Sequence, residues 1–105
     1  MSAGDGFREL GGVDRIIHEP ARLLLMALLY PLESADFLFL LRETGLTKGN
    51  LSAHLAKLEE AGYVTVEKSF RGKIPQTTYS LTEEGRAAFR AYRERMKRTV
   101  ESLPE

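Results

Sequence analysis

Residues 47–81 read TKGNLSAHLAKLEEAGYVTVEKSFRGKIPQTTYSL, and the spacing of their apolar residues changes once, at Gly62. Before Gly62 the leucines recur at intervals of four and three, as on one face of an α-helix: Leu51, Leu55 and Leu58. Thr47 is a residue type that caps helix N-termini, and the glycine ends the pattern. This stretch therefore predicts a helix from Lys48 to Glu60 whose leucines face the core.

After Gly62 the sequence is rich in β-branched and aromatic residues, which favour strands. The first predicted strand covers residues 63–70, and the second covers residues 76–81. Between them, residues 71–75 (RGKIP) contain glycine and proline, which are typical of turns. The pattern predicts a β-hairpin with Arg71 and Lys73 at its tip.

Two further helices are predicted upstream of this stretch. The first covers residues 13–30, and Pro20 leaves open whether it is one helix or two, because proline is favoured in a first helical turn. The second runs from Ala35 to Arg42, with Ser34 as its N-cap and Gly45 as its stop. A short turn separates it from the next helix, and two short helices joined by a glycine-containing turn are typical of a helix-turn-helix.

A last helix is predicted from its N-cap, Thr82, to about residue 103. Apolar side chains recur along it at helical spacing, and so long a helix has little left to cover in one small domain. We therefore expect a dimer interface formed by Phe89, Tyr92, Met96, Val100 and Leu103. A second, basic face is expected to be solvated or paired with the acidic N-terminal half rather than bound to DNA: Arg86, Arg90, Arg93 and Lys97.

The helix over residues 48–60 turns small and polar side chains away from its leucines, and such a face fits closely in a DNA major groove. Asn50 can pair bidentately with adenine, and the lysines can reach phosphate or guanine. The candidate DNA-binding residues are Thr47, Lys48, Asn50, Ser52, Ala53, His54 and Lys57. The alternative is the solvated face of an ordinary core helix, and the hairpin that follows favours DNA.

The hairpin tip adds Arg71 and Lys73 as candidate contacts to the duplex backbone or the minor groove. The alternative is a charged turn that serves only solubility. The formal net charge is zero, but the charges are unevenly distributed. Residues 1–46 carry seven acidic and four basic side chains, whereas residues 47–79 carry three acidic and five basic ones. The basic charge therefore lies where a nucleic acid would bind.

The composition limits the other classes of function. The chain has 105 residues, no cysteine and two histidines, so no disulfide and no dedicated metal site are expected. It shows no nucleophile–base pair and no phosphate-binding loop, so no enzyme activity and no cofactor are predicted. No apolar run reaches the roughly 20 residues that span a bilayer. Residues 1–12 lack the apolar segment of a signal peptide and are predicted to form a flexible tail on a cytoplasmic protein.

Two segments carry a resemblance to a known family: residues 50–64, NLSAHLAKLEEAGYV, and residues 78–86, TYSLTEEGR. They resemble the winged-helix transcriptional regulators of the MarR and ArsR type, in particular the compact archaeal and bacterial members. The resemblance implies DNA binding by the helix over residues 48–60, a wing at residues 70–75 and dimerisation through terminal helices. In such relatives DNA is faced by the residues that match Lys48, Asn50, Ser52 and His54. The chain lacks the cysteine or clustered histidine ligands of ArsR-type metal sensors.

These observations predict an α+β, mostly α fold, namely a winged helix-turn-helix. Three helices, a two-stranded wing hairpin and a long C-terminal helix at about residues 82–103 are expected within one domain, residues 13–105. The predicted function is sequence-specific binding of double-stranded DNA by a homodimeric transcriptional regulator, most often a repressor in such relatives. The alternative is a winged-helix module for protein–protein interaction without specific DNA binding. The sequence does not identify a small-molecule effector.

Overall fold

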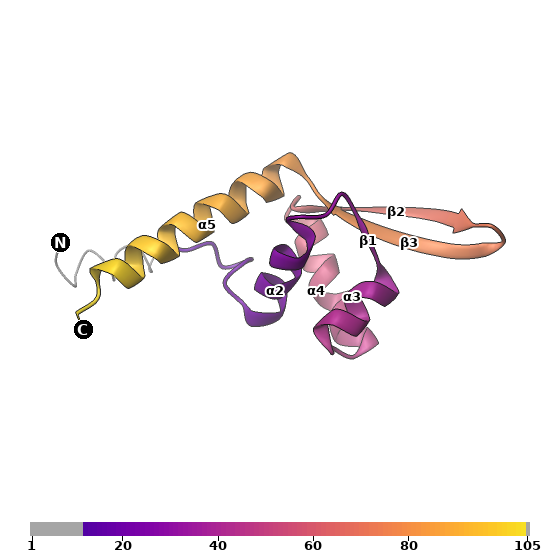
Figure 1. Cartoon of the computed structure of the whole chain (residues 1–105), viewed down its shortest axis with the longest axis horizontal. Helices are drawn as coiled ribbons and strands as arrows, with labels where there is room; N and C mark the ends of the chain where they lie inside the picture. Colours follow the sequence, from indigo (N-terminus) through magenta and orange to yellow (C-terminus); the bar gives the residue numbers. More distant parts are fainter. Residues whose placement is uncertain (1–11, 105) are drawn as a thin grey trace.

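The computed structural model describes residues 12–104, which form four helices and three strands (Figure 1). Their order is α2 (Pro20–Leu29), β1 (Ala35–Asp36), α3 (Phe37–Thr44), α4 (Lys48–Glu60), β2 (Val64–Arg71), β3 (Ile74–Leu81) and α5 (Glu83–Ser102). The predicted class, mostly helical with a helix-turn-helix followed by a hairpin and a long helix, is confirmed. Strand β1 was not predicted. None of the helices within residues 12–104 combines the length and the apolar character that crossing a bilayer requires.

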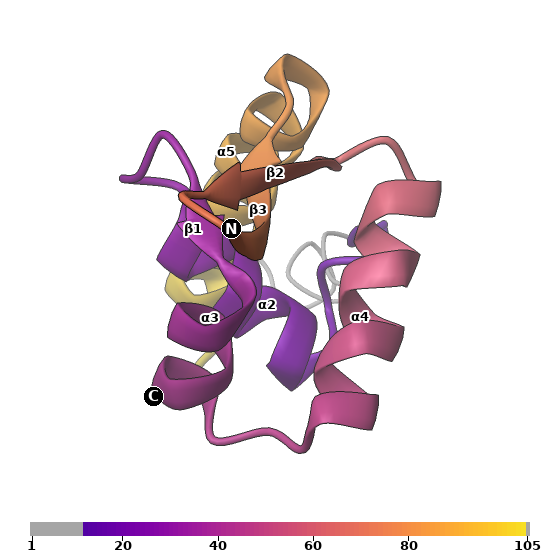
Figure 2. The ribbon, with the colours of Figure 1, turned by 90° about the vertical axis from the view of Figure 1, so that its right-hand side faces the viewer.

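The three strands form an antiparallel sheet in the order β1-β3-β2. Strands β2 and β3 pair along their full length, whereas β1 pairs only with Tyr79 and Thr78 of β3. Beyond this short strand the hairpin is two-stranded, and it projects as an arm past α3 and α4 (Figure 1). Viewed along the arm, α3 and α4 lie on either side of it (Figure 2). We call the β2–β3 hairpin the wing.

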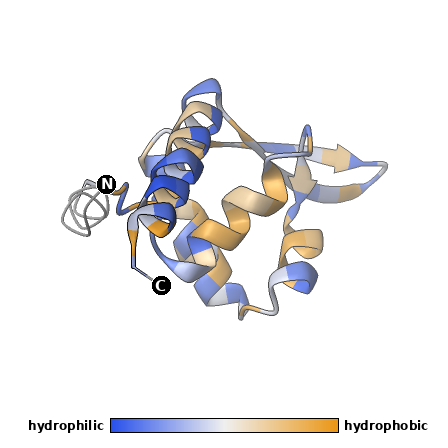
Figure 3. Ribbon diagram, turned by 60° about the vertical axis from the view of Figure 1, so that its left-hand side comes forward, coloured by the Kyte–Doolittle hydropathy of each residue, from blue (hydrophilic) through white to orange (hydrophobic). Residues whose placement is uncertain are grey.

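The core lies where α2 meets α3, α4 and the base of the sheet. Figure 3 shows apolar residues concentrated on the inner helices and polar residues along the outer side of α5. Fully burying one large aliphatic side chain stabilises a fold by about 1.5–3 kcal/mol. The large side chains that are fully buried come from these elements and, for Ile17, from the turns before α2: Ile17, Leu25, Met26, Leu29, Leu40, Leu51, Leu58 and Val64.

The first helix begins later than residue 13. Glu19 is extended, with φ −152° and ψ 130°, and its carboxylate accepts a hydrogen bond from the Ala21 N–H at 2.7 Å. Pro20 causes this break, because proline lacks an N–H and forces the preceding residue out of the helical region. Residues 13–19 form turns instead, and Asp14 caps them by accepting from the Ile16 N–H at 2.8 Å. A single helix over residues 13–30 is therefore wrong, whereas the alternative that Pro20 lies in a first helical turn is confirmed. Residues 1–11 of the predicted tail lie outside the described residues.

The predicted start of the second helix is also wrong. Asp36, and not Ser34, is the N-cap of α3, because its carboxylate accepts a hydrogen bond from the Phe39 N–H at 2.7 Å. Ala35 and Asp36 are extended and paired with β3, so they cannot join the helix. Gly45 ends α3 as predicted, with φ 69°, in the left-handed region that favours glycine.

The wing and α5 meet at a joint formed by Gly62, Tyr63, Thr82 and Gly85. The Tyr63 carbonyl accepts from the Thr82 N–H at 3.0 Å, and the Thr82 hydroxyl donates to the Gly62 carbonyl at 2.6 Å. Thr82 is the N-cap of α5, as predicted, and accepts from the Gly85 N–H at 2.8 Å. A Cβ on Gly85 would lie 2.9 Å from the Tyr63 carbonyl carbon, so only glycine fits there.

The Tyr63 side chain ties this joint to the start of the described chain. Its hydroxyl donates a hydrogen bond to the Asp14 carboxylate. Burial, together with this hydrogen bond and the carboxylate charge, raises the pKa of Tyr63 to about 12. The phenol therefore keeps its proton, and the hydrogen bond, through the whole neutral range.

Candidate nucleic-acid interface

Helix α4 presents one face to the core and the opposite face to solvent. Thr47 caps it, accepting a hydrogen bond from the Asn50 N–H at 3.1 Å. The leucine stripe is buried as predicted, with Leu51, Leu55 and Leu58 in the core. Because the leucines fix the rotation of the helix, its polar residues are turned outward.

Most of the candidate DNA-binding residues lie together on this outward face. Those exposed to solvent are Thr47, Lys48, Asn50, Ser52, Ala53 and Lys57. Gly49 and Ala56 are exposed between them, and a Cβ on Gly49 would meet nothing within 4 Å. The face is therefore smooth, polar and unobstructed by the rest of the described chain, as a helix that enters a major groove requires.

His54 is placed differently from the other candidates. Its ring is half-buried and turned toward the N-terminus of α2. Nδ1 lies 3.3 Å from the Glu19 carboxylate and 3.2 Å from the Arg22 guanidinium. These contacts hold α4 against the start of α2, so His54 has a partner inside the chain that its sequence position did not reveal.

The wing tip is tighter than predicted, because the strands extend to Arg71 and from Ile74. The turn between them consists of Gly72 and Lys73, and Gly72 has φ 66°. Glycine at the first position of a two-residue turn suits the twist of a hairpin. The turn predicted at residues 71–75 was therefore too long, and Arg71 and Lys73 are both exposed at the tip.

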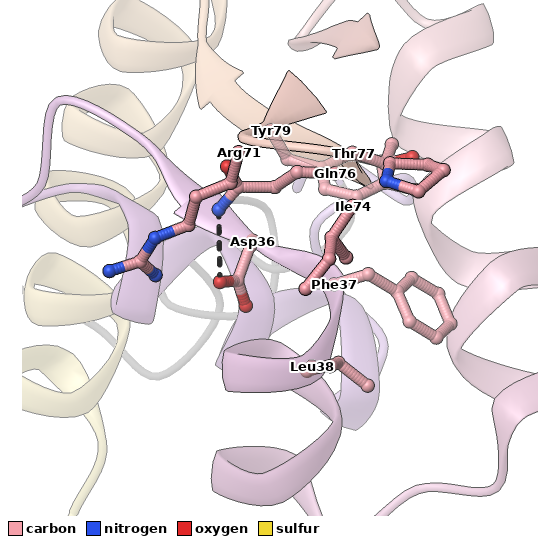
Figure 4. A pocket seen from close by; sticks show the side chains of 9 residues that line it. Asp36, Phe37, Leu38, Arg71, Ile74, Gln76, Thr77 and Tyr79 are labelled. Atoms are coloured by element: carbon pink, nitrogen blue, oxygen red, sulfur yellow. Dashed lines mark hydrogen bonds between the residues drawn. The ribbon is translucent and has the colours of Figure 1, made fainter. Parts of the chain in front are cut away.

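A groove of about 410 Å³ lies between the edge of the wing and the N-terminus of α3 (Figure 4). The Asp36 carboxylate lies in this groove and accepts a hydrogen bond from each side of it. One oxygen caps α3, and the other accepts a hydrogen bond from the Gln76 amide at 3.3 Å. This contact, together with the β1–β3 pairing, links the wing to the helix-turn-helix. Neither residue stood out in the sequence, since the contact joins segments forty residues apart.

The residues predicted for a dimer interface divide into two groups. Phe89 and Tyr92 are buried in the core of the chain itself, where Phe89 stacks 5.2 Å from Tyr30 and the Tyr92 hydroxyl lies 2.9 Å from His18 Nδ1. Met96 is half-buried against the same core. Val100 and Leu103, toward the end of α5, are 65% and 41% exposed. We call the five residues predicted for the interface the seam. Only its outer part, Val100 and Leu103, offers exposed apolar surface to a partner.

The basic face of α5 contacts the N-terminal half at the end of α2, through backbone carbonyls and the side chain of Tyr30. The Arg86 guanidinium donates to the carbonyls of Tyr30 and Leu32, at 2.7 and 3.1 Å. Arg90 donates to the Tyr30 hydroxyl at 3.4 Å, and this hydrogen bond is the largest influence that lowers the pKa of Tyr30. Arg86 is therefore a structural cap for the C-terminus of α2, where the carbonyls lack helical partners.

The comparison with known proteins assigns a class to this arrangement. Residues 21–100 match the family described as winged helix DNA-binding domain, and the chain belongs to this family. An uncharacterised protein of Methanocaldococcus jannaschii is 42% identical over 79 residues, which cover 74% of this chain and 85% of that protein.

Two solved structures extend the likeness over most of the chain. A transcriptional regulator homologue of Pyrococcus horikoshii has a TM-score of 0.86 and 27% identity, covering 96% of this chain and 99% of that one. A structure described as a MarR-family regulator of Enterococcus faecalis has a TM-score of 0.66 and 26% identity, covering 84% of each chain. The resemblance to MarR- and ArsR-type regulators is confirmed, and these likenesses support a DNA-binding regulator.

Proposed function

We propose that the chain is a homodimeric repressor that reads double-stranded DNA with α4 and holds the duplex with the wing. The observation that carries this proposal is the outward face of α4, where Lys48, Asn50 and Ser52 stand exposed around the small residues Gly49 and Ala53. The small residues allow the helix backbone to approach base edges, and the polar ones offer the hydrogen bonds. Asn50 is the candidate for adenine, and Lys48 for guanine or phosphate.

The wing supplies the contacts that do not depend on sequence. Arg71 and Lys73 are exposed at the tip, and the Asp36–Gln76 hydrogen bond joins the arm to the start of α3. Phosphate contacts of this kind set the position of a protein on the duplex, whereas base contacts select the sequence. In this proposal α4 therefore selects the DNA sequence through base contacts, and the wing binds the duplex through phosphate contacts.

Dimerisation would use the exposed end of α5. Val100 and Leu103 leave apolar surface uncovered there, and a two-fold axis at this end pairs two copies of α4 across a palindromic site. A dimer bound over two half-sites one helical turn apart covers about two turns of duplex. The predicted cytoplasmic location belongs to this proposal.

The wing is tested by a salt series. We expect the wild type to bind a random duplex of about 30 base pairs, or three helical turns, with an affinity that falls steeply with salt. Arg71→Ala/Lys73→Ala is expected to bind more weakly, with a slope of log K against log salt that is shallower by about two, because two phosphate contacts are lost. Fluorescence anisotropy measures both quantities.

The matched control is Arg93→Ala/Lys97→Ala, which removes the same two charges from the exposed face of α5. Its slope should stay close to that of the wild type, since these residues lie away from α4 and the wing. Equal slopes for the wing variant and the wild type would remove the wing from the interface. Absence of binding even at low salt would favour the protein-interaction module instead.

The dimer is tested at the end of α5. We expect the wild type to be a dimer at micromolar concentration and Val100→Glu/Leu103→Glu to be a monomer that keeps the helical circular dichroism of the wild type, because both residues are substantially exposed in one chain. Light scattering gives the mass. Ala87→Glu, on the opposite face of α5, should remain dimeric. A wild-type monomer would contradict the proposed seam.

A further inference from the structure

The wing tip carries apolar side chains that this chain leaves uncovered. Among the described residues, the two large hydrophobic side chains with the highest exposure are Phe70, at 72%, and Ile74, at 70%. Both flank the Gly72–Lys73 turn, and the arm projects past the helices at this point (Figure 1). A wing that held DNA by charge alone would need neither of them.

The register of the hairpin places these side chains on opposite faces of the tip. Phe70 pairs with Pro75, and Arg71 pairs with Ile74. Since side chains alternate along a strand, Ile74 shares its face with Arg71, and Phe70 shares the other face with Lys68. Each apolar side chain thus stands beside a cation, so both faces of the tip combine an apolar side chain with a positive charge, and the face of Ile74 and Arg71 also borders the groove that Asp36 lines.

The charge around the tip identifies the occupant as a polyanion. From Lys68 to Thr82 the sequence contains basic residues but no acidic one. Proteins that bind the minor groove combine arginine or lysine with apolar wedges, which unstack a base step and kink the duplex by about 20–90°. The same combination is present here, on a chain that belongs to a DNA-binding family.

We infer that Phe70 and Ile74 form an apolar wedge by which the wing bends DNA at the flank of the site read by α4. The cations hold the tip against the phosphates, and the apolar edge enters the minor groove between them. Bending then brings more of the duplex toward the protein, and it favours flanking sequences that deform easily, without hydrogen bonds to their bases. This inference rests on the proposed function and adds the deformation of the duplex to it.

The test separates bending from binding. Tethered-particle motion on a long plasmid fragment needs no known operator, because each kink shortens the tether wherever it forms. We expect the wild type to shorten the tether and Phe70→Ser/Ile74→Ser, which keeps every charge, to lose the shortening. In anisotropy the same variant should keep its salt slope and lose less than about tenfold in affinity for a random duplex, since its phosphate contacts remain.

The matched control is Leu24→Ser, which removes a 40% exposed leucine from α2, away from the groove that Ile74 lines, and should shorten the tether as the wild type does. A wild type that binds the duplex without shortening the tether overturns the wedge alone. Full shortening by the Phe70→Ser/Ile74→Ser variant also overturns it. If the wild type binds no duplex at low salt, both the proposed function and the wedge are overturned.

Besides DNA, an anionic lipid bilayer also combines a negatively charged surface with an apolar interior. Vesicles of phosphatidylglycerol and phosphatidylcholine test it directly by cosedimentation. We expect no binding that depends on Phe70 and Ile74. Vesicle binding that the double variant loses, without tether shortening by the wild type, would assign the tip to a membrane and overturn the wedge.

Discussion

Gly85→Ala is expected to lower the free energy of unfolding by about 3 kcal/mol, the upper range for overpacking a closely packed site. The added Cβ would meet the backbone of Tyr63, with 2.9 Å to its carbonyl carbon and 3.0 Å to its Cα. Neither the strand nor the helix can move away without breaking the hydrogen bonds of Thr82 at the joint. For a domain of this size the loss corresponds to a fall in melting temperature of about 12–24 °C, measured by circular dichroism.

The matched control is Gly49→Ala in α4. A Cβ at residue 49 meets nothing within 4 Å, and alanine favours a helix over glycine by about 1 kcal/mol. This variant should therefore melt at the same temperature as the wild type or slightly above it. Equal melting temperatures for the two variants would contradict the close packing at the joint.

Ala53→Glu is expected to weaken binding to any duplex by a hundredfold or more, which is about 3 kcal/mol. Residue 53 lies on the exposed face of α4, opposite the buried leucines, so the proposed complex places it within the major groove. A carboxylate there meets the phosphates at close range, and like charges opposed in an interface cost several kcal/mol. The folded state should keep its stability, because the side chain is exposed and glutamate is a good helix former.

The same charge placed elsewhere serves as the control. Ala87→Glu adds a carboxylate to an exposed position on α5, with an equal change in net charge. Its affinity for duplex should stay within about twofold of the wild type, since the added charge lies on α5, outside the proposed interface of α4 and the wing tip, and is exposed to screening by salt. Equal losses in the two variants would show that net charge, and not α4, governs binding.

The elements that the sequence predicted well are those whose signals are local. Helix α4 has the predicted bounds because Thr47 and the leucine stripe act within one helix. The N-cap of α5 follows in the same way, from Thr82 and the acidic residues of its first turn. The residues that face outward on α4 could therefore be named from the sequence, with His54 as the exception.

The features that the sequence did not predict depend on contacts between distant segments of the chain. Strand β1 consists of two residues and exists only because Tyr79 and Thr78 pair with them. That pairing displaces the start of α3 from Ser34 to Asp36, although serine is an equally good cap. The partners of His54, Glu19 and Arg22, likewise come from a different helix end.

The buried residues of α5 show the same limit of prediction from the sequence. Apolar residues at helical spacing indicate a buried face but not what buries it. The inner residues of the predicted seam, Phe89 and Tyr92, lie against Tyr30 and His18 of the same chain. Gly85 carried no periodic signal at all, and its role appears only when β2 and α5 are placed side by side.

The short reach of β1 has a consequence for the free energy with which the wing would bind a duplex. The last four pairs of the wing, from Lys68–Thr77 to Arg71–Ile74, have no third strand beside them. A two-stranded ribbon is only marginally stable in water, and fixing one residue costs about 1–2 kcal/mol of conformational entropy. Part of the binding free energy is thus used to order the arm, whatever the sequence beneath it. Stiffening the arm is therefore expected to strengthen binding to every duplex, because less conformational entropy is lost when the arm becomes ordered.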